Sequence, residues 1–162
     1  MRQVLVIPIL CYLFQLLEYA CFSLFGRWGD PHLMLLLVIF FYLYSGIRFS
    51  LWAALCAGIL KDCFSTMPFG AHIFSYMVCA CLAVFIRRHW YERGSSASKL
   101  MMVFLLTTAH TLIMAFLFKM VFEEVRWTEV LASVWLPEML ATMVAALFIF
   151  RRLLDVARLL RF

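Results

Sequence analysis

Long apolar runs, separated by short groups of glycine, proline and charged residues, make up most of this chain. Their lengths predict six helices, at residues 4–25, 32–45, 49–64, 70–86, 100–122 and 131–150. A helix that crosses a bilayer needs about 20 residues, so the second and third are short. Three alternatives remain open for this pair: it thins the bilayer, it tilts little, or it forms a partly buried hairpin.

Composition places these helices in a membrane. Hydrophobic residues make up 67% of the chain and aromatic residues 17%, and the mean hydropathy is +0.99, whereas soluble domains are about 45–50% apolar. The first apolar run is too long for the core of a signal peptide and no clear cleavage site follows, so we expect a retained helix. The 162 residues therefore predict an all-α integral membrane protein, with residues 1–162 forming one bundle of about six transmembrane helices.

Basic residues are distributed unevenly between the two sides of the predicted bundle. With the N-terminus inside, ten of the 14 lysines and arginines fall on the inner side, as the positive-inside rule requires of cytoplasmic loops. We therefore expect a bacterial cytoplasmic (inner) membrane protein with both termini in the cytoplasm. Two segments carry most of the inner charge: a flexible loop, 87–99, and a tail, 151–162, with the pattern of a short amphipathic helix.

The basic side chains of these two segments have two interpretations. They contact a partner or anionic lipid headgroups, or they only set the orientation of the chain. Membrane lipid is an expected partner and nucleic acid is not. The candidates are Arg87, Arg88, Arg93, Arg151 and Arg152.

Charged residues within the apolar runs gather in the outer half of the predicted bundle. They are Glu18, Lys61, Asp62, Lys119 and Glu138. Because a charge in a span costs about 2.5–3.5 kcal/mol on insertion scales, each needs a partner or a wet cavity. The cluster is then a set of internal ion pairs, a solvated ligand pocket, or a docking surface for an external partner. The outer loop adds Glu123, Glu124 and Glu129, an acidic rim suited to a positively charged partner.

No constellation for catalysis or metal binding is visible in the sequence. His110 has Thr107 and Thr111 on its face, which suits either a proton relay or a neutral histidine satisfied by hydroxyl groups. The sequence places no carboxylate at its depth. The four histidines share neither a spacing nor a membrane side that would gather a metal. We therefore expect no enzyme activity, no metal and no cofactor.

The third helix carries small residues four positions apart, which allow another helix to approach closely. These are the pairs Ala53 with Ala57 and Ala54 with Gly58. Asp62 follows one turn later on the same face, and the segment STMPFG then turns the chain back. We expect the Asp62 carboxylate to accept hydrogen bonds from the amides of this turn.

The stretch AGILKDCFSTMPFGAHIFSY resembles the middle of the MreD family of rod-shape-determining membrane proteins. The matching residues are Gly58, Asp62, Gly70 and Tyr76. The length, the Asp30-Pro31 start of the short second helix, the basic middle loop and the basic tail agree with the family over nearly the whole chain. Lys61 departs from it, because an apolar residue usually precedes the aspartate.

The resemblance implies a non-enzymatic scaffold of the bacterial elongasome, which supports lateral peptidoglycan synthesis and rod cell shape. The implied partners are MreC, as the direct contact, and MreB, RodA and the elongation penicillin-binding protein. The alternative is a substrate-binding subunit of an energy-coupling-factor vitamin transporter, a class related in fold whose outer pocket the charged cluster would line. Those subunits usually carry an Ala-x-x-x-Ala face on helix one, where this chain has Tyr12, Leu16 and Ala20. A small membrane enzyme is the weakest interpretation.

Overall fold

The computed structural model describes residues 2–25, 31–65, 67–90, 96–121 and 135–159. These residues form six helices and no strand, in agreement with the predicted all-α fold. The helices are α1 (Arg2–Phe25), α2 (Leu33–Ser45), α3 (Ile47–Phe64), α4 (Ala71–Trp90), α5 (Ser96–Val121) and α7 (Leu136–Leu159).

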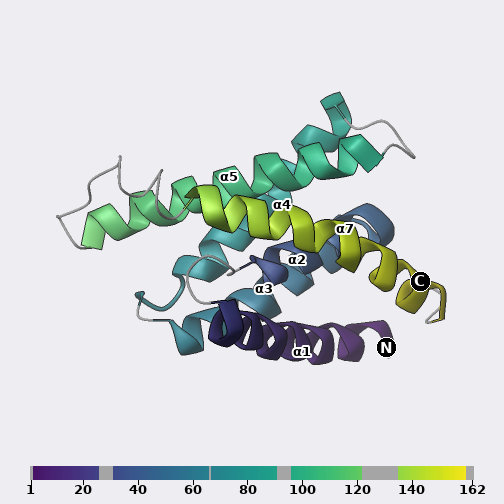
Figure 1. Cartoon of the computed structure of the whole chain (residues 1–162), viewed down its shortest axis with the longest axis horizontal. Coiled ribbons are helices and arrows are strands. Elements are labelled where there is room, and N and C mark those ends of the chain that lie inside the picture. Colours follow the sequence, from purple (N-terminus) through teal and green to yellow (C-terminus); the bar gives the residue numbers. More distant parts are fainter. Residues whose placement is uncertain (1, 26–30, 66, 91–95, 122–134, 160–162) are drawn as a thin grey trace.

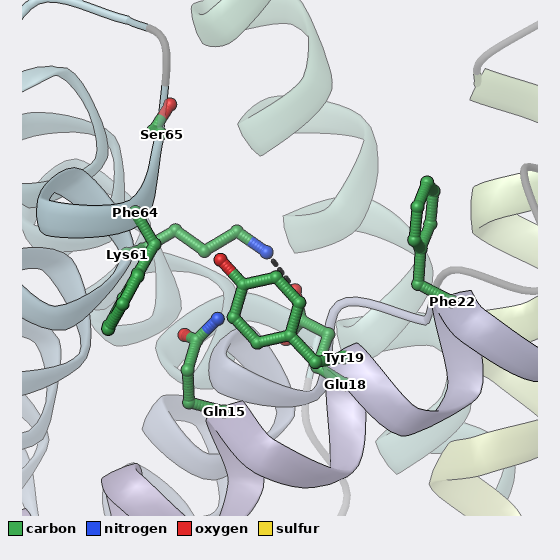
Figure 2. A pocket seen from close by; sticks show the side chains of 7 residues that line it. All are labelled: Gln15, Glu18, Tyr19, Phe22, Lys61, Phe64 and Ser65. Atoms are coloured by element: carbon green, nitrogen blue, oxygen red, sulfur yellow. Dashed lines mark hydrogen bonds and ion pairs between the residues drawn. The ribbon is translucent and has the colours of Figure 1, made fainter.

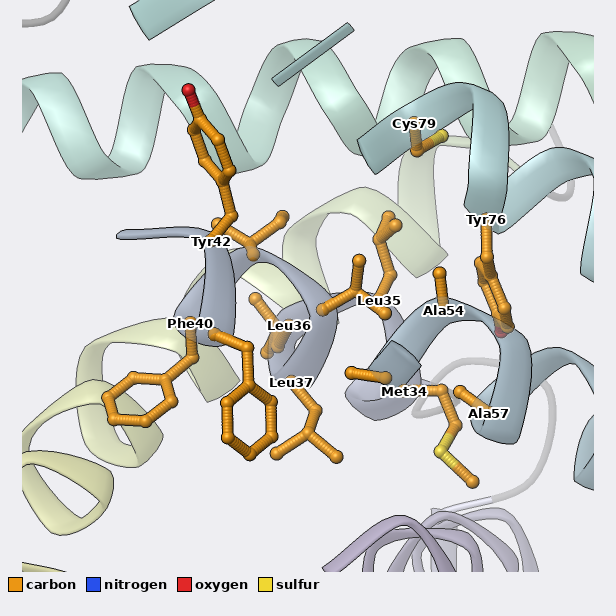
Figure 3. Close-up of a cluster of buried hydrophobic side chains, with 14 of the residues drawn as sticks. Met34, Leu35, Leu36, Leu37, Phe40, Tyr42, Ala54, Ala57, Tyr76 and Cys79 are labelled. Atoms are coloured by element: carbon orange, nitrogen blue, oxygen red, sulfur yellow. The ribbon is translucent and has the colours of Figure 1, made fainter. Parts of the chain in front are cut away.

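Helix α2 lies at the centre of the bundle and contacts each of the other five helices. Its residues from Leu33 to Tyr42 are all buried, because an apolar sequence on every face of a helix needs neighbours on every side. Figure 3 shows Tyr42 leaving α2 on one side and Phe40 and Leu37 on the opposite side. The core of the protein is therefore built around this helix.

The remaining helices surround α2 in chain order. Contacts join α1 to α3, α3 to α4, α4 to α5 and α5 to α7, and within the described residues α1 and α7 meet only through α2. In Figure 1, α1 lies on one side of α2 and α3, and α5 and α7 lie on the other. The first turn of α1 and the last turns of α7 lie at the same end of the molecule.

Three helices of the described chain contain stretches long and apolar enough to cross a membrane, namely Val6–Ser23, Ala71–Arg88 and Ala97–Val121. Large apolar side chains such as Phe85 and Phe148 are exposed on the outer helices, as expected for surfaces that face lipid. Apolar helices of this length fit a transmembrane protein.

The short α2 and its neighbour α3 form a partly buried hairpin, one of the three alternatives: α2 is buried, whereas Trp52 and Phe64 of α3 are exposed. Only Gly46, with a φ of 91°, separates the two helices, and Ser50 Oγ donates a hydrogen bond to Val38 O at 3.0 Å. The 13 residues of α2 cover only about 20 Å. Since protein surrounds α2, its ends do not have to reach the polar layers of the bilayer.

The expected bounds of two segments, the basic loop and the basic tail, are wrong. Helix α4 continues to Trp90 and α5 begins at Ser96, so most of the expected 87–99 loop is helical. Helix α7 runs without a break to Leu159, so the basic tail is its continuation rather than a separate short helix. The physical reason is that lysine and arginine are good helix formers, so the basic residues extend the apolar helices instead of ending them. The expected start of the sixth helix, 131, lies outside the described residues.

Candidate functional site

Asp62 joins the end of α3 to the start of α4. Its Oδ2 accepts hydrogen bonds from Gly70 N at 2.9 Å and Ile73 N at 3.3 Å. Its Oδ1 accepts one from His72 N at 2.9 Å and lies 2.8 Å from His72 Nδ1. The first amides of a helix have no partner within it and carry partial positive charge. The hydrogen bonds expected from the turn are therefore present, and they occupy both oxygens of a fully buried carboxylate.

Gly58 lies where α3 packs closely against the backbone of α4. A Cβ atom at this position would lie 2.5 Å from Ile73 Cα and 2.8 Å from Ile73 N. No side chain fits in that space, and the neighbouring Ala54 and Ala57 are fully buried. The small-residue face of α3 is therefore covered by other helices of the same chain.

Lys61 and Glu18 form an ion pair that links α3 to α1. The Glu18 side chain is 3% exposed and that of Lys61 is 22% exposed. This pair fits the first of the three alternatives for the charged residues, a set of internal ion pairs. It neutralises a carboxylate that would otherwise be costly to bury.

Glu138 connects α7 to the residue that precedes α2. Its Oε2 lies 3.1 Å from His32 Nε2, and His32 N donates a hydrogen bond to Thr142 Oγ1 at 3.0 Å. Thr142 Oγ1 in turn donates to Glu138 O at 2.6 Å. The side chains of one α7 turn therefore hold the N-terminal end of the central helix.

His110 lies in the interior between α4 and α5. Its Nδ1 is 2.7 Å from Ser75 Oγ, and its ring stacks on Tyr76 with centroids 5.0 Å apart. The expectation of an interior histidine satisfied by a hydroxyl is confirmed, although the hydroxyl belongs to α4. Thr107 and Thr111, the candidates from its own helix, do not bond its ring in the described structure; Thr111 Oγ1 donates to Thr107 O instead.

Three histidines gather at this end of the bundle, which the sequence analysis did not foresee. The His32 ring lies 4.9 Å from that of His110, and the His72 ring lies 6.4 Å from it. Glu138 joins this group indirectly, because it contacts His32, whose ring lies against that of His110. The order of the helices explains why these histidines meet. Because successive helices run in opposite directions, the starts of α2 and α4 and the second half of α5 lie at the same end of the bundle.

We call this group of residues the polar cluster. It includes side chains from α1, α3, α4, α5 and α7 and the residue before α2, and its members are Glu18, His32, Lys61, Asp62, His72, His110 and Glu138. Among the described residues, no group of histidines, cysteines and carboxylates is placed to hold a metal ion. The contacts of the cluster are mainly internal, so its evident effect is to hold the helices of the bundle in register.

A pocket of about 410 Å³ opens beside the cluster, between α1 and α3. Its polar wall consists of Gln15, Glu18, Lys61 and Ser65, and its aromatic wall of Tyr19, Phe22 and Phe64. Figure 2 shows Lys61 extending from α3 toward Glu18, with Gln15 one turn before Glu18 on α1. A pocket and an internal ion pair, features of two of the three alternatives, therefore occur at the same place.

The opposite end of the bundle carries the predicted basic residues. Arg87, in the last turn of α4, donates a hydrogen bond to Tyr42 O at 3.4 Å and lies 5.5 Å from the centre of the Tyr42 ring. It therefore contacts the C-terminal part of α2, where cations are favourable. Arg88 is exposed on the same turn, and Arg151 and Arg152 continue α7. Arg93, Glu123, Glu124 and Glu129 lie outside the described residues.

Comparison with known proteins identifies the family. The model of the family described as rod shape-determining protein MreD matches residues 1–155. No curated protein is significantly similar to the chain, and no solved structure is significantly similar to it. The family match covers nearly all of the helical bundle, including every residue of the polar cluster. The chain belongs to the MreD family of rod shape-determining proteins.

Proposed function

We propose that this protein is a non-enzymatic scaffold of the elongasome, acting in lateral peptidoglycan synthesis. Its partners would be MreC, in direct contact, and MreB, RodA and the elongation penicillin-binding protein. The observation that supports a scaffold role is the polar cluster, whose charged side chains join helices of one bundle instead of facing an open reaction site. A bundle held in this way would present fixed helix faces and rims to its partners.

The proposed scaffold lies in the bacterial cytoplasmic membrane with both termini in the cytoplasm and its six helices within the bilayer. MreC would bind the outer rim, where the acidic loop with Glu123 and Glu124 complements a positively charged surface. The inner basic residues would contact cytoplasmic partners or anionic lipid. Asp62 does not belong to the docking surface, because both its oxygens accept hydrogen bonds from α4.

A substrate-binding subunit of an energy-coupling-factor transporter is the second candidate, and the pocket beside Glu18 is the observation in its favour. The small-residue faces argue against a transporter subunit. The buried Ala53, Ala57 and Gly58 lie in contacts within this chain, so that face is not open to a coupling subunit. The relation in fold to those subunits remains a proposal.

Replacing the acidic loop tests the scaffold proposal. Glu123→Lys combined with Glu124→Lys should reduce co-purification of MreC with the tagged protein, because the rim would then repel a positive partner. Glu92→Lys reverses one charge in the inner linker and should leave the recovery of MreC unchanged. In host cells depleted of the natural protein, the wild-type gene should restore rods and the double variant should restore them poorly. Full MreC recovery and normal rods with the double variant would contradict docking at this rim.

A further inference from the structure

The pocket between α1 and α3 contains buried hydrogen-bond acceptors that the protein does not use. Within the described part of the chain, Gln15 Oε1 and Glu18 Oε2 have no hydrogen-bond partner. The two residues are 3% and 2% exposed, and both line the pocket. A buried acceptor without a donor loses the hydrogen bonds that it made to water and gains none in return. A ligand that donates N–H or O–H groups would therefore be favoured here.

The charges of the pocket are balanced, which narrows the chemistry of the ligand. Its polar wall has one carboxylate, Glu18, and one ammonium group, Lys61, which form an ion pair. An ammonium group has three N–H donors, and the bond to Glu18 uses one of them. A ligand with both a negative acceptor and a positive donor would satisfy Lys61 on one side and Gln15 and Glu18 on the other. An ion of a single charge would leave one of these interactions unmade.

The position of the pocket places that ligand near the surface of the membrane. Glu18 lies about 10 Å before the end of α1 at Phe25, and Lys61 about 5 Å before the end of α3 at Phe64. The aromatic residues Tyr19, Phe22 and Phe64 line the pocket and are exposed at the surface, as is typical of residues at the level of the headgroups. Leu16, on the same helix, is also exposed and offers an apolar path for an acyl chain.

We propose that this pocket binds the headgroup of a phospholipid that carries a phosphodiester and a primary ammonium, that is, a phosphatidylethanolamine. Lys61 donates to the phosphate, Gln15 Oε1 and Glu18 Oε2 accept from the ammonium, and the acyl chains lie along the exposed side of α1. The proposal does not depend on the scaffold role, because it rests only on the pocket and its charges.

Lipid retention by the purified protein tests the proposal. The protein is placed in nanodiscs with equal amounts of phosphatidylethanolamine and phosphatidylcholine of identical chains, then released and examined by native mass spectrometry. The two headgroups share the phosphate, but phosphatidylcholine has three methyl groups in place of the N–H donors. We expect about tenfold preferential retention of phosphatidylethanolamine, the equivalent of one hydrogen bond to a charged group. Equal retention of the two lipids would overturn the proposal.

Variants locate the lipid within the structure. Gln15→Leu removes an acceptor without touching the ion pair and should abolish most of the preference, and Glu18→Gln should reduce it. Glu138→Gln makes the same carboxylate-to-amide change outside the pocket and should retain the preference. An equal loss in Gln15→Leu and Glu138→Gln would overturn the assignment to this pocket. Soluble phosphoethanolamine should raise the unfolding temperature less than the lipid does, and an equal effect would assign the pocket to a free zwitterion instead.

Discussion

Asp62 shows how one charged residue can be kept in an apolar chain. Its two oxygens take part in four hydrogen bonds, three from backbone amides at the start of α4 and one with the His72 ring. Hydrogen bonds to a charged acceptor are stronger than neutral ones, and the amides at a helix start favour a negative charge. The carboxylate is therefore a structural element of the α3–α4 turn.

Replacement of Asp62 should affect stability and not docking. Asp62→Asn removes the charge and turns one acceptor into a donor that faces backbone N–H groups, so we expect a loss of about 1.5–3 kcal/mol. Thermal unfolding of the protein in detergent measures this loss. Asp155→Asn makes the same change in the last turns of α7 and should have little effect. If Asp62→Asn unfolded like the wild type but failed to bind MreC, the carboxylate would be a partner contact.

Helix α3 is the element that connects the two sides of the bundle. It contacts α1, α2 and α4, and each contact uses a different feature of its sequence: Lys61 bonds Glu18 of α1, Ser50 bonds α2, and Gly58 faces the backbone of α4. Its small residues are therefore required by packing within the chain.

Adding a side chain at Gly58 tests the packing of α3 against α4. In Gly58→Ala the new Cβ would lie 2.5 Å from Ile73 Cα, so the helices must separate, at a cost of about 1–3 kcal/mol. Gly58→Leu should cost more. Cys63→Leu adds volume to an exposed position of the same helix and should leave the unfolding temperature in detergent nearly unchanged. An unchanged unfolding temperature in Gly58→Leu would mean that α3 and α4 do not pack in this way.

The molecule as a whole has two chemically different ends. One holds the polar cluster and the pocket, and the other carries Arg87, Arg88 and Lys99 together with the first turn of α1 and the last turns of α7. On the positive-inside rule, we propose that the basic end faces the cytoplasm. The structure and the charge distribution thus place the same helix ends together. The positive-inside rule is the basis for the proposed orientation of these ends across the membrane.

Reporter fusions test this orientation. Fusions at Ser96 and after Phe162 should be active with a reporter that works only in the cytoplasm, and an insertion at Thr128 should be active only with a periplasmic one. The reason is the ten-to-four division of the 14 basic residues between the two sides. A periplasmic signal from the fusion after Phe162 would contradict the proposed topology.

By itself, the sequence was sufficient for the class of the protein, for the six helices of the described residues and for the chemistry of one turn. Apolar periodicity and composition depend on neighbouring residues, and Asp62 bonds amides only 8 to 11 positions away. The family resemblance also followed from a continuous stretch, and the family match confirmed it.

Only the tertiary structure decided which helices are neighbours. The place of α2 at the centre, the approach of Glu138 to His32 across 106 positions and the histidine group depend on how the helices are arranged around one another. Likewise, the unpartnered acceptors of Gln15 and Glu18 line a pocket only because α3 lies beside α1 in the structure. The physical reason is that a helix repeat specifies which residues share a face, whereas the partner of that face is chosen by packing over the whole bundle.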